Sequence, residues 1–207
     1  MVSFAAQERA ALHGFALPGR HGASAGAAGL LIEQRIDLSF ASVIAKRGKH
    51  DQLISAVETA YGVALPKAPR RVTRGSVTFA GTGPDQWIAS AEGPEAPNFA
   101  ARVRARIGLF AAVSDQTDAR LVLRLSGPKV RDVLAKGVPL DLHPKTFKPG
   151  DVAATLVAYI GVQLDRLDDA TFQLTAPRSM AGSFWSWLSA SAAEFGYDVV
   201  TADGAAL

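Results

Sequence analysis

The sequence contains no cysteine. This absence excludes disulfides, thiolate catalysis and the cysteine-ligated classes of zinc and iron–sulfur site. Charge is also scarce, because Asp, Glu, Lys and Arg make up only 20% of the 207 residues, against roughly 25% in a typical domain. Ala, Ser and Gly take the place of the missing charges, which is the composition we expect of a subunit whose faces are covered by partners.

Long apolar runs are absent as well. No stretch approaches the length that crosses a bilayer. Near the N-terminus, Gln7, Glu8 and Arg9 interrupt any apolar region of the kind found in a signal peptide. We therefore expect a cytoplasmic protein with no membrane partner.

A strong excess of positive charge is missing too. Lys and Arg total 22 against 19 acids, which gives a net charge of +3. A nucleic-acid-binding protein usually gathers its positive charge on one face, whereas acids here separate the basic residues into small groups. This favours solvated faces over a phosphate track, and we expect no nucleic-acid partner. The three groups are Arg70, Arg71 and Arg74; Arg102, Arg104 and Arg106; and Lys129, Arg131 and Lys136.

Strands and helices follow one another in a regular order along the rest of the chain. Helices are expected after the caps Asp51, Asn98 and Ser179, and one more opens with Pro128 at its first position. A glycine closes each helix and is expected to take the left-handed conformation there. These glycines are Gly62, Gly108, Gly137 and Gly196. The predicted strands are 36–47, 75–80, 85–91, 109–114, 119–125, 151–158, 160–167, 171–175 and 197–200.

This order occurs twice, each time as strand, helix, two or more strands, helix and strand. It is the split βαβ pattern of a ferredoxin-like unit. The sequence therefore predicts an α+β fold, in which residues 36–202 form a single domain of two fused ferredoxin-like halves, 36–115 and 119–202. Residues 1–35 are predicted to be an extended N-terminal arm, because residues 14–29 are rich in Gly and Ala and have little apolar bulk to bury.

No catalytic or cofactor motif is complete. Gly81-Thr82-Gly83 begins like a dinucleotide fingerprint, but it runs into a strand where the fingerprint opens a helix. Ser126 follows a strand, yet the nucleophile elbow requires a glycine at the position of Arg124. Lys129 lacks the glycines of a phosphate-binding loop. We predict no catalytic residue and no cofactor-binding residue in this chain.

The histidines and the clustered carboxylates are the residues that could serve as metal ligands or as acids and bases. The four histidines, at 13, 21, 50 and 143, show no metal-ligand spacing, so no metal site is predicted. A general base also needs a partner group, which the sequence alone does not identify. The cluster Asp165, Asp168 and Asp169 is interpreted as a charged hairpin turn.

The last helix carries the candidate interface. Phe184, Leu188 and Phe195 share one face at helical spacing and suit the core. The other face is almost free of charge, and its small residues allow another surface to approach closely. Trp185 stands at its edge, where an interface anchor is expected; alternatively, Trp185 caps the core of its own domain. The candidate interface residues are Trp185, Ser186, Ser189, Ala190 and Ala193.

Between Arg70 and Val200 the chain resembles the gamma subunit of heterotetrameric sarcosine oxidase. Each short motif is weak alone, but their order and spacing together are specific. The motifs are Gly83-Pro84-Asp85-Gln86-Trp87-Ile88, Ser114-Asp115-Gln116, Leu121 to Pro128, Asp141-Leu142-His143-Pro144, Phe147, Gly150-Asp151, Leu167-Asp168-Asp169, Thr171-Phe172, Pro177-Arg178-Ser179, and Phe184-Trp185 with Trp187-Leu188.

The resemblance implies a fold similar to the folate-binding domain of the glycine-cleavage T-protein, with two related halves. It also implies an accessory subunit in an assembly that oxidises sarcosine to glycine, passes the methyl carbon to tetrahydrofolate and forms hydrogen peroxide. The implied partners are the alpha, beta and delta subunits. FAD and FMN would lie on beta, NAD and tetrahydrofolate on alpha, and zinc on delta, with no cofactor on this chain.

A second reading places the chain in a different class, as a free-standing folate-dependent aminomethyltransferase or a related folate-binding protein. The chain is short for a T-protein, and it lacks the cysteine-containing motif of the folate-binding repair proteins. A basic nucleic-acid-binding module is a third reading, which salt-dependent DNA binding would support.

Overall fold

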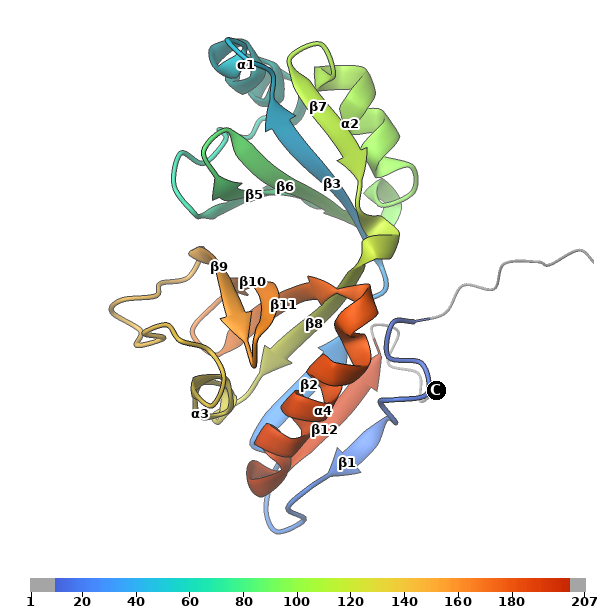
Figure 1. The fold of residues 1–207 in the computed structure, drawn as a ribbon, viewed down its shortest axis with the longest axis vertical. Helices are drawn as coiled ribbons and strands as arrows, with labels where there is room; N and C mark the ends of the chain where they lie inside the picture. The colour runs from blue at the N-terminus through green and yellow to red at the C-terminus, as the bar shows by residue number, and fades with distance from the viewer. Residues whose placement is uncertain (1–9, 202–207) are drawn as a thin grey trace, which may run out of the picture.

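The computed structural model describes residues 10–201, which form two units, each a sheet with helices packed on it (Figure 1). The first unit is a five-stranded sheet in the order β4-β5-β6-β3-β7. It contains β3 (Leu38–Ala45), α1 (His50–Tyr61), β4 (Arg71–Arg74), β5 (Val77–Gly83), β6 (Gln86–Glu92), α2 (Phe99–Ile107) and β7 (Ala111–Asp115).

The second unit is a seven-stranded sheet in the order β1-β12-β2-β8-β11-β10-β9. Its C-terminal elements are β8 (Arg120–Ser126), α3 (Val130–Ala135), β9 (Val152–Val157), β10 (Ile160–Arg166), β11 (Thr171–Pro177), α4 (Ala181–Ala192) and β12 (Tyr197–Thr201). Its N-terminal strands are β1 (Gly19–His21) and β2 (Leu30–Gln34). All the strands predicted after residue 36 are therefore present, in a mixed fold of sheets and helices.

Buried and exposed side chains alternate along the strands, and the buried ones form a hydrophobic core in each unit. In β8, Leu121, Leu123 and Leu125 are buried in the core that α3 and α4 cover, while Arg120 and Arg124 lie on the opposite face, which is turned towards the first unit. The first unit has its own core beneath α1 and α2. Because burying a large apolar side chain stabilises a fold by about 1.5–3 kcal/mol, each unit has its own source of stability.

The segment predicted as an N-terminal arm belongs to the second sheet. β1 pairs with β12, and β2 lies between β12, to which it is parallel, and β8, to which it is antiparallel. Leu30 and Ile32 are buried and alternate with more exposed residues, as in a strand with one face on the core. This pattern is too short to stand out beside the Gly- and Ala-rich stretch. The arm prediction over residues 1–35 is thus wrong for β1 and β2, and residues 1–9 lie outside the described part of the chain.

The insertion of β2 also changes the order predicted for the second half. In the first unit β7, the strand after the second helix, lies directly beside β3, the strand before the first helix. In the second unit β12 and β8 have the corresponding positions along the chain, but β2 separates them. The second unit is therefore not a simple split βαβ half.

The four glycines after the helices do not share one role. Gly62 has the expected left-handed conformation, with φ 62° and ψ 28°. Gly196 has a positive φ of 64° but an extended ψ of 141°, and Gly108 is right-handed at φ −64°. At Gly137, a Cβ atom would lie 2.6 Å from Cζ2 of Trp187. Glycine therefore suits position 137 because the Trp187 ring lies close to the backbone there.

The helix starts differ from the predictions by a few residues. α1 begins one residue before Asp51, α3 begins two residues after Pro128, and Ser179 lies in a 3₁₀ turn before α4. Asn98 does stand at the N-cap of α2, although its side chain makes no capping bond. Among residues 10–201, no helix is long and apolar enough to cross a membrane.

Candidate functional site

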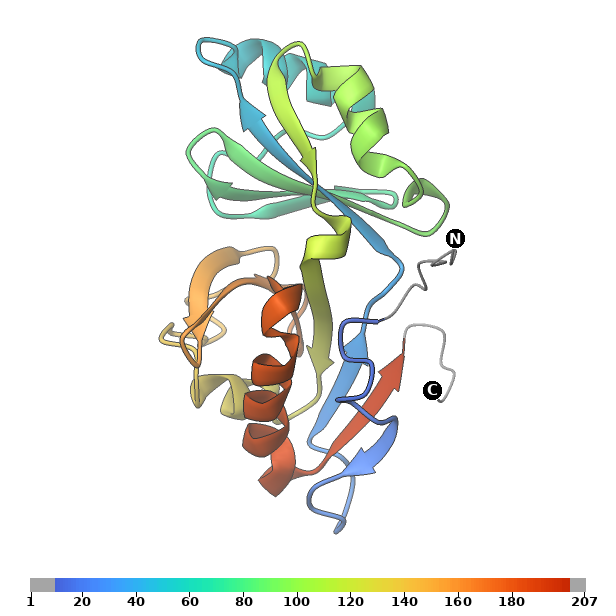
Figure 2. The same cartoon turned by 45° about the vertical axis from the view of Figure 1, so that its right-hand side comes forward.

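Helix α4 presents the candidate interface on the surface of the second unit (Figure 2). Phe184 and Leu188 are fully buried against the sheet. Ser186 and Ala190 are exposed, and Ser189 and Ala193 are half-buried. The face of small, uncharged residues therefore exists as a surface, as the sequence pattern predicts. Its contact with another subunit stays a prediction.

Trp185 lies elsewhere. Its side chain is only 9% exposed and belongs to the core of the second unit. The indole packs edge-on against the ring of Tyr197, with 6.2 Å between ring centroids. Trp185 thus has the alternative role considered for it, as a cap on the core of its own domain, and it has little surface left to offer a partner.

Each residue of the three basic groups has an ion-pair or hydrogen-bond partner within the chain. The three groups therefore do not form the continuous stripe of unpaired cations that a phosphate track requires. The pairs are Arg70 with Asp151, Arg71 with Asp165, Arg74 with the Gly62 carbonyl, Arg102 with Glu95, Arg104 with the Val113 carbonyl, Arg106 with the Ala60 carbonyl, Lys129 with Asp132, Arg131 with the Asp169 carbonyl, and Lys136 with Glu194.

His21, His50 and His143 make separate contacts in the fold. His50, at the start of α1, lies 2.5 Å from the Asp85 carboxylate through Nδ1, a pairing across 35 positions that the sequence could not reveal. Both side chains are about half-exposed, so water screens the pair. His21 stacks on Tyr197, and Nδ1 of His143 accepts a bond from the Lys145 amide. No cluster of three or more possible ligands that could hold a metal ion occurs among the described residues.

The carboxylates of the predicted turn divide into two kinds. Asp168 and Asp169 do lie in the turn between β10 and β11, where Asp168 accepts the Ala170 amide and Asp169 pairs with Arg166 at 2.9 Å. The backbone hydrogen bond from Ala170 is the main cause that lowers the pKa of Asp168. This much agrees with a charged turn.

Asp165 does not belong to that turn. It lies on β10 with 3% of its surface exposed, on the sheet face that the first unit covers. Arg71 approaches it to 3.8 Å from β4, and Gln163 donates to it at 2.8 Å. Burial raises its pKa to about 6, although Arg71 and Gln163 lower it. The interpretation of Asp165 as part of a charged hairpin turn is wrong, because this residue lies on β10 and the sequence does not show which sheet face another unit covers.

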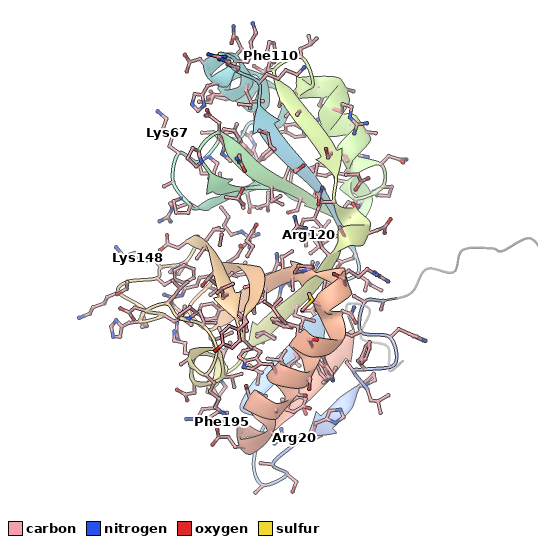
Figure 3. The ribbon with its side chains drawn as sticks, in the orientation of Figure 1. Arg20, Lys67, Phe110, Arg120, Lys148 and Phe195 are labelled. Atoms are coloured by element: carbon pink, nitrogen blue, oxygen red, sulfur yellow. The ribbon has the colours of Figure 1, made fainter. Side chains whose placement is uncertain are left out.

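A second ionic group joins the units where β2 leads into β3. The buried Arg35 donates through Nε to Asp37 at 2.7 Å and through Nη2 to Glu92 at 2.8 Å. These bonds raise the pKa of the Arg35 guanidinium, and the Arg35 hydrogen bond lowers that of Asp37. Arg120, labelled in Figure 3, lies at the same junction, where burial lowers its pKa.

Hollows occur at the junction of the units and between α1 and α2. A polar cleft of about 480 Å³ surrounds Arg35, whose charge its carboxylate neighbours already balance; it is lined by Glu33, Arg35, Asp37, Ser76, Glu92, Gly93, Pro94 and Arg124. A groove of about 720 Å³ between α1 and α2 is lined by Asp51, Gln52, Ser55, Ala56, Thr59, Ala60, Arg106 and Phe110. The charged groups at the junction join two units of one chain.

Comparisons with known proteins give a consistent result. Residues 47–194 match the model of the sarcosine oxidase, gamma subunit family. The chain is 33% identical over 150 residues to the sarcosine oxidase subunit gamma of Corynebacterium sp. (strain P-1), covering 70% of this chain and 72% of that protein. It is 32% identical over 144 residues to its counterpart from Arthrobacter sp., covering 68% and 70%.

Among solved structures, a chain of heterotetrameric sarcosine oxidase from Corynebacterium sp. U-96, in complex with pyrrole 2-carboxylate, superposes with a TM-score of 0.72 at 26% identity, covering 84% of this chain and 88% of that one. The glycine cleavage system aminomethyltransferase T from Bartonella henselae gives a TM-score of 0.63 at 15% identity over 84% of this chain and 48% of that one. The second similarity concerns the fold alone.

Proposed function

The chain belongs to the sarcosine oxidase gamma subunit family, and from this membership we propose that it is a non-catalytic, accessory subunit of a heterotetrameric sarcosine oxidase. The observation that carries the proposal is the structural match to a chain of such an enzyme, which extends over 84% of this chain and 88% of the other. Accessory here means that the chain supplies folded surface to the assembly, while the reacting groups lie on other subunits.

The partners in this proposal are alpha, beta and delta subunits in the cytoplasm. FAD, FMN, NAD, tetrahydrofolate and zinc would be held by those subunits. The junction of the two units supports this assignment, because Arg35 is already bonded to Asp37 and Glu92 and its charge is not available to an anionic cofactor. The internal pairing of the basic groups points in the same direction.

The proposed contact surface includes the exposed small residues of α4. Ser186 and Ala190 carry no long side chain that would hold a partner at a distance. Arg or Lys is the usual occupant of an exposed helix face, and burying such a charge in an interface would be costly. The small residues of α4 thus suit close packing against another subunit.

The two units are also proposed to be related halves, as in the fold of the T-protein. Both place the strand before the first helix beside the strand before the second helix, as β3 beside β6 and β8 beside β11. The inserted β2 is then an addition to the second half. Superposition of the two units without β1 and β2 tests this relationship, and unmatched helices would contradict it.

The functional proposal is tested by purifying a tagged copy of this chain from its native host. We expect three further chains to co-purify, together with a flavin absorption spectrum and sarcosine-dependent peroxide formation. The same chain purified alone from a heterologous host should be colourless and inactive. Purification from the native host without partners, or a flavin on the isolated chain, would refute the proposal. Folate-dependent methyl transfer by the isolated chain would support the aminomethyltransferase reading instead.

A further inference from the structure

The two sheets have four edge strands, and charge protects three of them. β1 is only three residues long and carries Arg20, β4 carries Arg71 and Arg74, and β7 carries Asp115. Short length and charged side chains are the usual devices that keep a sheet edge from pairing with another chain. β9 has neither device, because its six residues Val152–Val157 contain no charge, no proline and no glycine.

Within residues 10–201, the outer side of β9 has backbone groups that no neighbouring strand of the sheet pairs. β9 contacts β10 through a hairpin closed by Val157 and Ile160, with Ala158 and Tyr159 in the turn at φ 47° and 69°. The closing pair of a two-residue hairpin is bonded across the ladder. By alternation, Ala154 and Leu156 therefore direct their N–H and C=O groups away from β10. Val152 has the same parity, and its N–H donates to the Pro69 carbonyl at 2.8 Å.

The chain itself shows what this edge accepts. Pro69–Arg71 lies along the start of β9 as an extended segment, with an antiparallel bridge between Arg70 and Asp151 and a second bond of 2.8 Å from the Arg71 amide to the Gly150 carbonyl. This added piece of strand ends at Pro69, and residues 153–157 continue beyond it. Their outer side is apolar and accessible, since Leu156 is 48% exposed and Tyr159, at the tip, is 96% exposed. Figure 1 shows β9 as the last strand of the second sheet, with the loop from α3 running beside it.

We propose that residues 153–157 of β9 are a docking edge on which an extended, uncharged strand of another subunit continues the seven-stranded sheet, with Tyr159 packing beside it. The inference rests on the proposed function, because it takes the occupant from the same assembly. An uncharged occupant is indicated, because an edge without Lys, Arg, Asp or Glu offers no counter-charge to a charged strand.

A second copy of this chain fits the edge less well. In a two-fold antiparallel pairing centred on Thr155, position 153 would face position 157 of the copy, and position 151 would face position 159 of the copy. Asp151 is already bridged to Arg70, so the tip of the second hairpin would meet Pro69–Arg71. Moving the centre to Leu156 avoids this clash but leaves only positions 155–157 paired. A strand from a different polypeptide can begin where Pro69 ends and fill the edge.

The test uses the complete co-expressed assembly with wild type, Ala154→Pro and Leu156→Lys. Proline at 154 removes an outward N–H and leaves the bonds to β10, which an edge strand tolerates. Lys at 156 adds the charge that the other edges carry. Ala112→Lys on β7, an exposed position at an edge that already has Asp115, is the matched control. We expect both β9 variants to weaken assembly at least 10-fold and the control to leave it unchanged.

Amide hydrogen exchange gives an independent measurement. We expect the Ala154 and Leu156 amides to exchange at least 10-fold more slowly in the wild-type assembly than in the free wild-type chain. A thermal melt of each variant as a free chain shows whether that variant folds. Assembly of both β9 variants at wild-type affinity, with no change in exchange, would overturn the inference and leave the proposed function intact. A wild-type chain that joins no assembly would overturn both. A dimer of the free chain that Leu156→Lys abolishes would identify a second copy as the occupant and would overturn the proposal.

Discussion

The guanidinium of Arg71 lies 3.8 Å from the carboxylate of Asp165, across the contact between the two units. Both groups are shielded from water, and burial acts on each in the direction that disfavours its charge: it lowers the pKa of Arg71 and raises that of Asp165 to about 6. Arg71 and the hydrogen bond from Gln163 lower the pKa of this carboxylate, while Arg124 lowers and Glu92 raises the pKa of Arg71. The pair links the two units, but removing its two charges from water costs free energy.

Asp165→Asn should remove a pH dependence of stability. The pKa of Asp165 is about 6 in the fold, above the ordinary value of 3.8, so the folded protein binds this proton more tightly than the unfolded chain does. The contribution of Asp165 to stability should therefore fall as the pH rises from 4 to 7, by up to about 3 kcal/mol. We expect the difference between variant and wild type in urea unfolding to change over this window. A constant difference for Asp165→Asn would contradict the prediction.

Arg35→Met should loosen the junction of the units. It removes bonds to Asp37 and Glu92, and these carboxylates are exposed enough to be hydrated afterwards. We expect a loss of about 1–3 kcal/mol at pH 7. The bond from Arg35 lowers the pKa of Asp37, so its contribution is present above the ordinary pKa and is lost as the pH falls below it. The deficit should shrink below about pH 4. Arg20→Met, at an exposed pair, should cost under about 0.5 kcal/mol.

Gly137→Ala should destabilise the second unit by about 1–3 kcal/mol, because the added methyl group would lie 2.6 Å from the Trp187 ring, which must move. Tryptophan fluorescence and near-ultraviolet circular dichroism should both report the displacement. Gly161→Ala is the matched control, since a Cβ there meets nothing within 4 Å. Equal stability of the two variants would show that Trp187 yields without cost.

Ser186→Arg and Ala190→Arg should leave the free chain folded, because Arg has good helix propensity at an exposed position. Each should weaken assembly about 10-fold or more, since the interface would have to bury a charge or open a gap. The measurements are subunit co-elution and a thermal melt of the free chain, with Ala105→Arg on the exposed side of α2 as the control. Unchanged assembly in both variants would assign this face to solvent, and a large loss of stability would place it in the core.

The fold could be predicted from local signals wherever those signals were long. The alternation of β8 and the glycine after α1 each correspond to an element in the structure. β2 escaped prediction because its pattern follows a Gly- and Ala-rich stretch and because its partners, β12 and β8, lie far away in the chain. Nothing in a local pattern indicates that a strand will be inserted between two others.

The candidate site was predicted in part for the same reason. Helical periodicity identified the exposed Ser186 and Ala190, but a position at the edge of a face, such as Trp185, depends on what packs over it. Asp165 and Arg35 were missed because their environment is made by the contact between units. Asp165 alternates with Leu164, which faces the core, so the local pattern assigns Asp165 to solvent and carries no signal of the unit that covers this face.

The position of β2 sets the order in which the molecule can be completed during synthesis. The first sheet uses strands from Leu38 to Asp115 only, so it can close while the rest of the chain is still on the ribosome. β2 emerges before all of them, yet it must wait for β8 and finally for β12, near the end of the chain. Until then Leu30 and Ile32 have no core to enter. Closing so long a loop is slow, and the nascent second unit is therefore the stage at which this subunit is most exposed to misassociation.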